Sequence, residues 1–234
     1  MTLRRYWLAI LLAITSTTLI QAQRSDDDAA IKRGNELVAQ AKYESAIREY
    51  ERVTPATDLY ARALYNIGVC QYELWRTDLA IDYYSRATAA TRNNYPRASY
   101  ALGVALEDRG RFGEAREAYQ QAINRSRGEF AAAQFRLGLL IARDGDYPEA
   151  GHLFRQAIRK SGEHLPASHN NLGVILAWTG HLKEAEAEFK IALRLSGGDF
   201  KDAARNLKVC RTLLAGETNS VALSLADDLS LVAN

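Results

Sequence analysis

The side chains best suited to catalysis or metal binding are few in this chain and widely spaced. The histidines are His152, His164, His169 and His181. None of them pairs with another at i and i+4 beside an acidic third ligand, so the chain lacks a helical metal-binding motif. It also lacks a phosphate-binding glycine loop and a nucleophile elbow. We therefore expect solvent-exposed histidines, no metal, no cofactor and no enzymatic activity.

The elements that would have to position any site are pairs of amphipathic helices. Between residues 131 and 158, apolar side chains recur at helical spacing on both sides of a break at residues 144–146. A hairpin this short cannot bury its own apolar face, so copies of it must stack. The copies are marked by a glycine, an alanine twelve residues later and an aromatic four residues after that. The glycines are Gly34, Gly68, Gly103, Gly138 and Gly173, the alanines Ala46, Ala80, Ala115, Ala150 and Ala185, and the aromatics Tyr50, Tyr84, Tyr119, Phe154 and Phe189.

This pattern resembles the tetratricopeptide repeat (TPR), a helix-turn-helix unit of about 34 residues. The resemblance covers residues 27–200 and implies an all-α, right-handed solenoid of five TPR-like hairpins plus a C-terminal capping helix. We expect the solenoid to span residues 23–215. Its predicted parts are repeats at about 27–60, 61–95, 96–130, 131–165 and 166–200, and a cap at 201–215.

The N-terminus has the features of a secretory signal peptide. Arg4 and Arg5 come before an apolar run, and Ala22 stands at a plausible cleavage site. We expect residues 1–22 to be removed and the chain to be exported, to a periplasm or out of the cell. The alternative is an uncleaved membrane anchor, although the apolar stretch is shorter than the ~20 residues of a spanning helix.

The charge of the mature chain argues against nucleic acid as a partner. The whole chain has 30 basic and 28 acidic residues, and removal of the two leader arginines leaves 28 of each. A formal charge near zero is unlike the basic surface that binds a phosphate backbone.

Two local departures from the repeat lead to expectations about shape. Asp26, Asp27 and Asp28 stand where carboxylates would cap the start of the first helix. Trp75 occupies the turn position where later repeats carry glycine. Because glycine adopts the left-handed conformation most easily, we expect the turn after Leu74 to differ in shape.

The cysteines and the tail complete the inventory. Cys70 lies in the second repeat and Cys210 beyond the fifth, so stacked helices would hold them farther apart than the ~7 Å limit for a disulfide. We expect two free, buried thiols. In the tail, residues 216–234, a short helix would place Val221, Leu225 and Leu229 on one face.

Relatives in the resembled family bind partner peptides or helices in a concave groove lined by the first helix of each repeat. Carried over by spacing, this implies a protein or peptide partner held by aromatic, aliphatic and charged side chains. The predicted groove residues are Tyr65, Val69, Tyr72, Tyr100, Val104, Phe135, Leu139, Arg143, Val174 and Trp178.

Two other interpretations stay open at this point. Tyr65 and Tyr100 are also common packing residues at these places in the resembled family, so one alternative is that they serve packing alone. The chain is also compatible with a self-associating structural or assembly protein of the cell envelope. The sequence favours a noncatalytic interaction scaffold over both.

Overall fold

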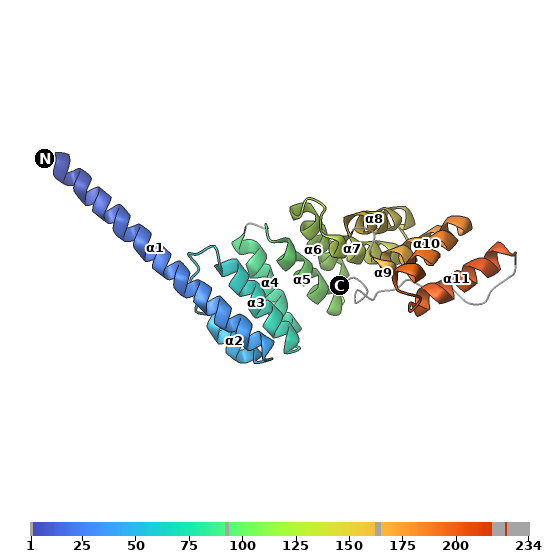
Figure 1. Cartoon of the computed structure of the whole chain (residues 1–234), viewed down its shortest axis with the longest axis horizontal. Coiled ribbons are helices and arrows are strands. Elements are labelled where there is room, and N and C mark those ends of the chain that lie inside the picture. The colour runs from blue at the N-terminus through green and yellow to red at the C-terminus, as the bar shows by residue number, and fades with distance from the viewer. Residues whose placement is uncertain (1, 92–93, 162–164, 217–222, 224–234) are drawn as a thin grey trace. The chain divides into compact units, whose positions relative to one another are not determined.

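The computed structural model describes residues 2–91, 94–161, 165–216 and 223, with side chains from Gln21 onward. Every regular element in this part of the chain is an α-helix (Figure 1), which confirms the all-α prediction. The helices are α1 (Thr2–Ala39), α2 (Tyr43–Tyr50), α3 (Tyr60–Glu73), α4 (Thr77–Ala90), α5 (Pro96–Asp108), α6 (Phe112–Arg125), α7 (Ala131–Arg143), α8 (Tyr147–Lys160), α9 (Pro166–Trp178), α10 (Leu182–Leu195) and α11 (Lys201–Leu214).

The helices form two compact units, Met1–Arg111 and Phe112–Asn234. In the first unit, each helix from α1 to α5 packs against the next one along the chain. The same order holds from α6 to α11 in the second unit, where α9 also contacts α11. Contact between successive elements is the packing expected of stacked repeats. The third predicted hairpin contributes α5 to the first unit and α6 to the second.

The recurring glycines are explained by the aromatic residues that face them. A Cβ atom added to Gly68 would lie 2.6 Å from the Tyr84 ring, and one added to Gly138 would lie 2.8 Å from the Phe154 ring. Both distances are shorter than carbon atoms tolerate, so only glycine lets the ring pack against the first helix of the hairpin. The alanine between them in sequence is fully buried in both hairpins. Gly34 and Gly173 stand in the same relation to Tyr50 and Phe189.

The turn of each hairpin has one shape throughout the chain. Its left-handed residue has a φ of +59° at Trp75, +88° at Gly145 and +87° at Gly180. The amide of the following residue donates to the carbonyl five residues earlier, as in Arg76 to Gln71 at 2.9 Å. This hydrogen bond defines the Schellman end of a helix. The expectation that the Trp75 turn would differ in shape is therefore wrong.

The N-terminal aspartates do not cap a helix, because α1 continues through them from Thr2. Asp27 is only 1% exposed and accepts hydrogen bonds from the Thr54 amide at 3.2 Å and the Thr57 hydroxyl at 2.7 Å. Gln23 on the previous turn of α1 also donates to it. The capping interpretation is wrong for Asp27, whose carboxylate instead fastens the α2–α3 loop to the side of α1.

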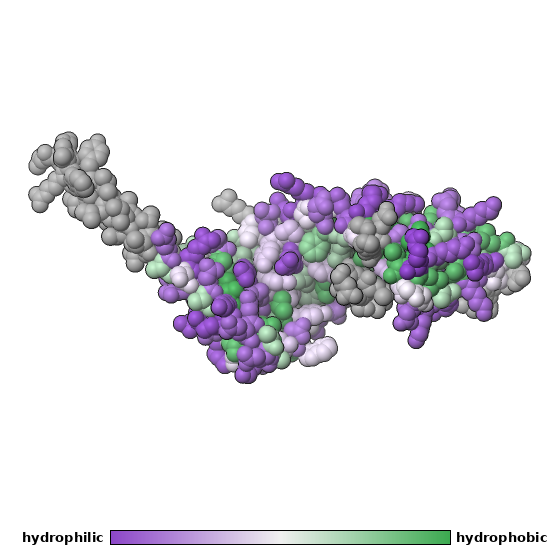
Figure 2. Space-filling view, in the orientation of Figure 1, coloured by the Kyte–Doolittle hydropathy of each residue, from purple (hydrophilic) through white to green (hydrophobic). Residues whose placement is uncertain are grey.

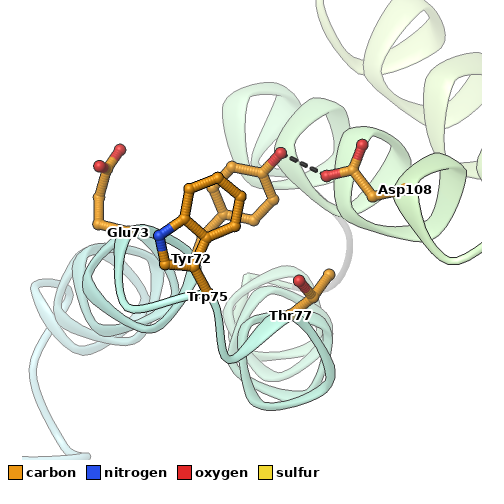
Figure 3. A pocket seen from close by; sticks show the side chains of 5 residues that line it. All are labelled: Tyr72, Glu73, Trp75, Thr77 and Asp108. Atoms are coloured by element: carbon orange, nitrogen blue, oxygen red, sulfur yellow. Dashed lines mark hydrogen bonds between the residues drawn. The ribbon is translucent and has the colours of Figure 1, made fainter.

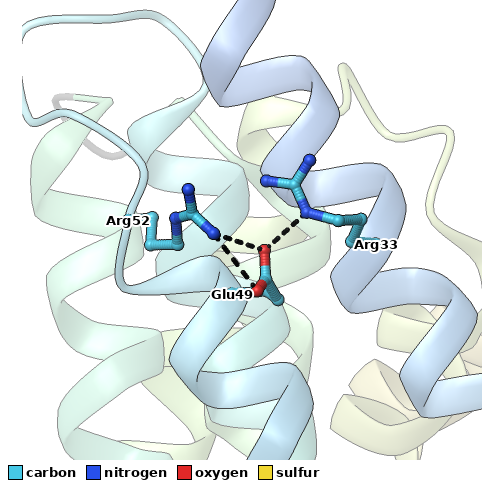
Figure 4. A network of polar contacts seen from close by, with 3 residues as sticks. All are labelled: Arg33, Glu49 and Arg52. Carbon is cyan, nitrogen blue, oxygen red and sulfur yellow. Dashed lines mark hydrogen bonds and ion pairs between the residues drawn. The ribbon is translucent and has the colours of Figure 1, made fainter.

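An ion-pair network joins α1 to α2 in the same hairpin (Figure 4). Arg33 Nε lies 2.7 Å from Glu49 Oε2, and Arg52 Nη1 lies 3.4 Å from the same carboxylate. These two guanidinium groups draw the pKa of Glu49 below its usual value, the Arg33 hydrogen bond being the largest cause. Arg33 stands where later repeats have an apolar residue before the glycine. The ion pair with Glu49 explains why an arginine is accommodated at this position.

The second unit has one large apolar core with a small polar ladder inside it. The core contains Phe154, Phe189 and Leu207 with many of their neighbours on α7–α11. Within it, the Asn206 amide donates to the Asn170 side chain at 3.0 Å, across α11 and α9. The buried amides are hydrogen-bonded, as buried polar groups must be if they are not to destabilise the fold.

No helix in the described residues combines the length and apolar character needed to cross a membrane.

Candidate functional site

Trp75 closes the α3–α4 turn in a conformation that suits glycine. The left-handed backbone costs a non-glycine residue about 1–2 kcal/mol. Burial does not compensate this cost, because the Trp75 side chain is 90% exposed. Neither backbone preference nor packing therefore explains a tryptophan at this position. Residues that break local rules without a gain in stability are candidates for function.

A pocket of about 560 Å³ adjoins this turn. Its walls come from the end of α3, the start of α4 and the end of α5, as Figure 3 shows. The Tyr72 hydroxyl reaches across and donates a hydrogen bond to the Asp108 carboxylate, which ties α3 to α5. The described lining residues are Tyr72, Glu73, Trp75, Thr77 and Asp108.

The charge of this pocket is negative. Glu73 and Asp108 both line it, and its described lining contains no basic side chain. The arginines that follow in sequence have other partners: Arg76 lies 3.4 Å from Glu44, and Arg109 lies 2.9 Å from Asp78. An aromatic surface beside two carboxylates can bind a cation through both cation–π attraction and charge pairing.

The predicted groove residues of the first unit are all partly exposed. They are Tyr65, Val69 and Tyr72 on α3 and Tyr100 and Val104 on α5. The Tyr65 ring also packs within the unit, 5.8 Å from the Tyr84 ring and 5.4 Å from the Tyr95 ring. Partial burial raises the pKa of Tyr65. On the face shown in Figure 2, apolar side chains of this unit reach the surface in patches separated by hydrophilic ones.

The predicted row is interrupted in the second unit. Phe135 is 0% exposed, and its ring packs 5.9 Å from the Phe154 ring inside the core. Val174 is also 0% exposed. These two side chains offer no surface to a partner in this structure, so the accessible row is shorter than the sequence predicts.

The other three predicted residues of the second unit keep some exposure. Leu139 is partly buried against the core. The Arg143 guanidinium carbon lies 3.5 Å from the centre of the Phe112 ring, and the Trp178 ring lies 5.2 Å from the Tyr147 ring. Trp178 is 41% exposed, which makes it the more accessible of the predicted aromatics in this unit.

The prediction of solvent-exposed histidines is wrong at His169. This residue is 6% exposed, and its Nδ1 lies 2.7 Å from Glu188 Oε2. The corresponding residues of the earlier hairpins, Leu64, Ser99 and Gln134, are buried as well, so the repeat register contained the signal. His152 and His181 are exposed, and His164 lies outside the described residues. Among the described residues, no three histidine, cysteine or acidic side chains gather in a way that would hold a metal.

Both cysteines are free and buried, as predicted. Burial raises the pKa of Cys70 to about 11. Burial also raises the pKa of Cys210. These thiols are poor nucleophiles at neutral pH.

The family of the chain follows from its sequence. A family model described as "Tetratricopeptide repeat" matches residues 31–96, 85–129, 100–164 and 143–200. The chain belongs to the TPR family. No protein of curated function matches it in sequence.

Solved TPR structures share the fold at low sequence identity. The MamA protein is 22% identical with a TM-score of 0.62, over 74% of this chain and 92% of its own. YrrB, described as a TPR protein with an unusual peptide-binding site, is 21% identical with a TM-score of 0.62, over 82% and 97%. Pseudomonas aeruginosa PilF is 16% identical with a TM-score of 0.63, over 84% and 95%. These similarities confirm the TPR solenoid fold.

Sequence reasoning noticed Trp75 in this TPR chain but did not place it in a site. The available signal was a large aromatic at a turn position that is glycine in three other repeats, Gly110, Gly145 and Gly180. Only the structure shows that Trp75 is exposed and that it lines a pocket together with Asp108, 33 residues away in sequence.

Proposed function

We propose that this chain is a noncatalytic protein-interaction scaffold whose first unit binds a peptide segment or helix of a partner. The contact surface consists of the partly exposed row on α3 and α5 together with the Trp75 pocket. TPR membership supports this proposal, because stacked repeats present extended surfaces for binding. The peptide-binding site in the description of YrrB, a TPR protein of similar fold, is consistent with it.

The observation that carries the proposal is the tryptophan at the turn. Trp75 is 90% exposed and holds a left-handed backbone, so the folded chain alone gains little from it. Tryptophan is among the residues that most often dominate binding energy at protein interfaces. A partner that covers the indole would supply the burial that the isolated chain does not.

The pocket also indicates the chemistry of the partner. Glu73 and Asp108 would favour a lysine or arginine beside the Trp75 ring. Aliphatic and aromatic side chains along α3 and α5 would favour apolar residues nearby in the same segment. The expected ligand is therefore a segment with apolar residues and a basic residue at the position that meets Trp75.

The test is selection of peptides from a displayed library on the purified full chain, followed by affinity measurement on single substitutions. We expect the selected peptides to carry a basic residue among apolar ones. Trp75→Gly should weaken their binding at least about tenfold, or ~1.4 kcal/mol. Glycine suits the turn conformation, so this variant should keep the helical circular dichroism and should be at least as stable to heat as the natural chain.

Leu79→Ala is the matched control, because Leu79 is an apolar side chain of the same hairpin that is 48% exposed and lies outside the pocket lining. It should bind the selected peptides as the natural chain does. Equal affinity of Trp75→Gly, Tyr100→Ala and the natural chain would show that the first unit is not the binding surface.

We also propose that the chain is exported and that residues 1–22 are removed. The arginines and apolar run at the N-terminus support this. Cleavage after Ala22 would keep Gln23, whose side-chain amide donates to Asp27 at 3.1 Å and to Thr54 at 2.6 Å. The mass of the chain purified from its native envelope or medium tests this, and a mass that includes the first 22 residues would contradict it.

A further inference from the structure

Helix α9 is enclosed on every side over its first three turns. All residues from Pro166 to Leu176 are buried, including the polar side chains Ser168, Asn170 and Asn171. Because consecutive residues on a helix point about 100° apart, an unbroken buried run means that no face of the helix meets solvent. The first helix of a stacked hairpin normally leaves one stripe open.

The comparison with α7, the equivalent helix of the preceding repeat, locates the covered stripe. Ala132 and Leu139 are partly exposed on α7, whereas their counterparts Ala167 and Val174 on α9 are both 0% exposed. Alanine occupies the first of these positions in both helices, so the size of the residue does not explain the difference. Helix α11 contacts α9 and donates a hydrogen bond from Asn206 to Asn170, so α11 accounts for part of this burial.

One described residue of the C-terminal tail supplies a cover. Leu223 lies seven residues beyond Gly216 and is 9% exposed. It belongs to the same apolar core cluster as Val174 of α9 and Leu207 of α11. A leucine of the tail is thus packed against the helices of the second unit. The predicted face of Val221, Leu225 and Leu229 lies outside the described residues.

The covered stripe is the continuation of the predicted binding surface. Val174 was expected to face a partner, and it stands one residue after the repeat glycine, as Val69 and Val104 do in the first unit. Those two remain partly exposed, while Val174 is fully buried. The same repeat position is therefore open in one unit and occupied in the other.

We propose that the C-terminal segment carrying Leu223 is an intramolecular occupant of the groove over α9 and competes there with partner segments. This proposal rests on the proposed function, because it assigns a regulator to the same kind of surface. The occupant also indicates the ligand of this part of the groove. It would be a short segment with a leucine, other aliphatic residues within two positions on either side and carboxylates a few residues later, as in residues 221–228.

The competition has a simple physical basis. A tethered segment of this length has an effective concentration in the millimolar range near its own chain. A free partner of equal intrinsic affinity must displace it, so the apparent affinity of the partner equals its intrinsic affinity multiplied by the fraction of chains in which the groove is open. Loss of the leucine should open the groove and raise the affinity for added segments.

The first test is a photocrosslinker, p-benzoylphenylalanine, placed at Leu223 in the full chain. Irradiation of a mixture of ¹⁴N- and ¹⁵N-labelled chains, followed by mass spectrometry, should give crosslinks to residues 167–174 within one isotope. The same group at Leu214, which is 37% exposed at the end of α11, should not crosslink there. Crosslinks only between isotopes would place the tail on a second copy, and that result or the absence of α9 crosslinks would overturn the proposal.

The second test uses a synthetic peptide of residues 217–234 and the full chain carrying Leu223→Asp. The peptide should bind this variant at least about tenfold more tightly than it binds the natural chain. A peptide that itself carries Leu223→Asp should bind neither chain. Equal affinity of the natural peptide for both chains would overturn the proposal, and Leu223→Ser replaces the aspartate variant if circular dichroism shows a loss of helix.

The two proposals fail separately. The crosslinking result depends only on Leu223 and α9, whereas the test of the proposed function depends on Trp75 and Tyr100 in the first unit. If Trp75→Gly loses the selected peptides but no α9 crosslinks form, peptide binding by the first unit is supported and regulation by the tail is refuted. If α9 crosslinks form but Trp75→Gly binds the selected peptides as the natural chain does, occupation of the α9 groove by the tail is supported and the Trp75 site is refuted.

Discussion

A single carboxylate, Asp27, joins α1 to the loop between α2 and α3. It accepts hydrogen bonds from Gln23 on α1 and from Thr54 and Thr57 in the following loop. Burial alone would raise the pKa of Asp27, but these hydrogen bonds together bring it below its ordinary value of 3.8. They favour the ionised form because each donor stabilises the negative charge.

Asp27→Asn should therefore destabilise the first unit by about 1–3 kcal/mol at pH 7. In the natural chain the folded pKa lies below the unfolded one. The stabilisation is thus complete above the unfolded value of 3.8 and is lost as the pH falls through the folded value. Urea unfolding at pH 7 and pH 3 measures both effects. Asp28→Asn, at an exposed neighbour on α1, is the control and should leave stability within about 0.5 kcal/mol.

The Cys70 thiol should resist alkylation in the folded chain. Its pKa is raised by burial from 9.0 to about 11, so at pH 8 the thiolate fraction falls about a hundredfold. Iodoacetamide labelling of Cys70, followed by mass spectrometry, should be slower by at least that factor in native buffer than in denaturing urea. Equal rates would mean that the thiol is accessible in the folded state.

At the scale of the element, the hairpin depends on the contact between a glycine and an aromatic ring. Gly138 and Phe154 come from α7 and α8, and the absence of one Cβ decides how closely those helices approach. The same relation recurs in the other described glycine–aromatic pairs, so the repeat is a repeat of contacts as well as of residue types.

Gly138→Ala should destabilise the second unit by about 1–3 kcal/mol, because its Cβ would lie 2.8 Å from the Phe154 ring. Gly113→Ala is the matched control, since Gly113 lies within α6 and a Cβ there meets nothing within 4 Å. That substitution should stabilise the chain by about 0.5–1 kcal/mol through helix propensity. Thermal unfolding of both variants gives the comparison, and equal midpoints would contradict the steric explanation.

Sequence periodicity was sufficient to predict the hairpins because the glycine, alanine and aromatic residues recur wherever neighbouring helices make the same contact. It failed where a contact is particular to one place. Asp27 was interpreted as a cap because three aspartates look the same in sequence, although only the middle one meets Thr54 and Thr57. Val174 was predicted to line the groove because it follows a repeat glycine, a position carried over by spacing from the resembled family. The tail that carries Leu223 has no counterpart in the repeats, so its position could not be predicted in this way.

At the scale of the molecule, stability should be local, because each helix packs mainly against its neighbours in the chain. In such arrays the energies of repeats and of their interfaces add, and a defect is felt by adjacent repeats. The molecule should therefore not unfold as a single cooperative unit.

Hydrogen exchange of the Gly138→Ala variant tests this expectation. Amides in α7 and α8 should exchange at least about tenfold faster than in the natural chain, as expected for a loss of ~1.4 kcal/mol in local opening free energy. Amides in α3 and α4 should keep their natural rates. A uniform acceleration through both units would show that the chain opens as one body.

The constancy of the turns has a consequence for how such a chain acquires new specificities. The same hydrogen bond closes the turn whether its left-handed residue, the tip of the turn, is Ala41, Trp75 or Gly145. The tip is therefore a position that recurs once per hairpin and accepts side chains of different size. A large side chain grafted there costs about 1–2 kcal/mol of backbone strain and leaves the helices untouched. Recognition elements can thus be exchanged one tip at a time, while the architecture beneath them is preserved.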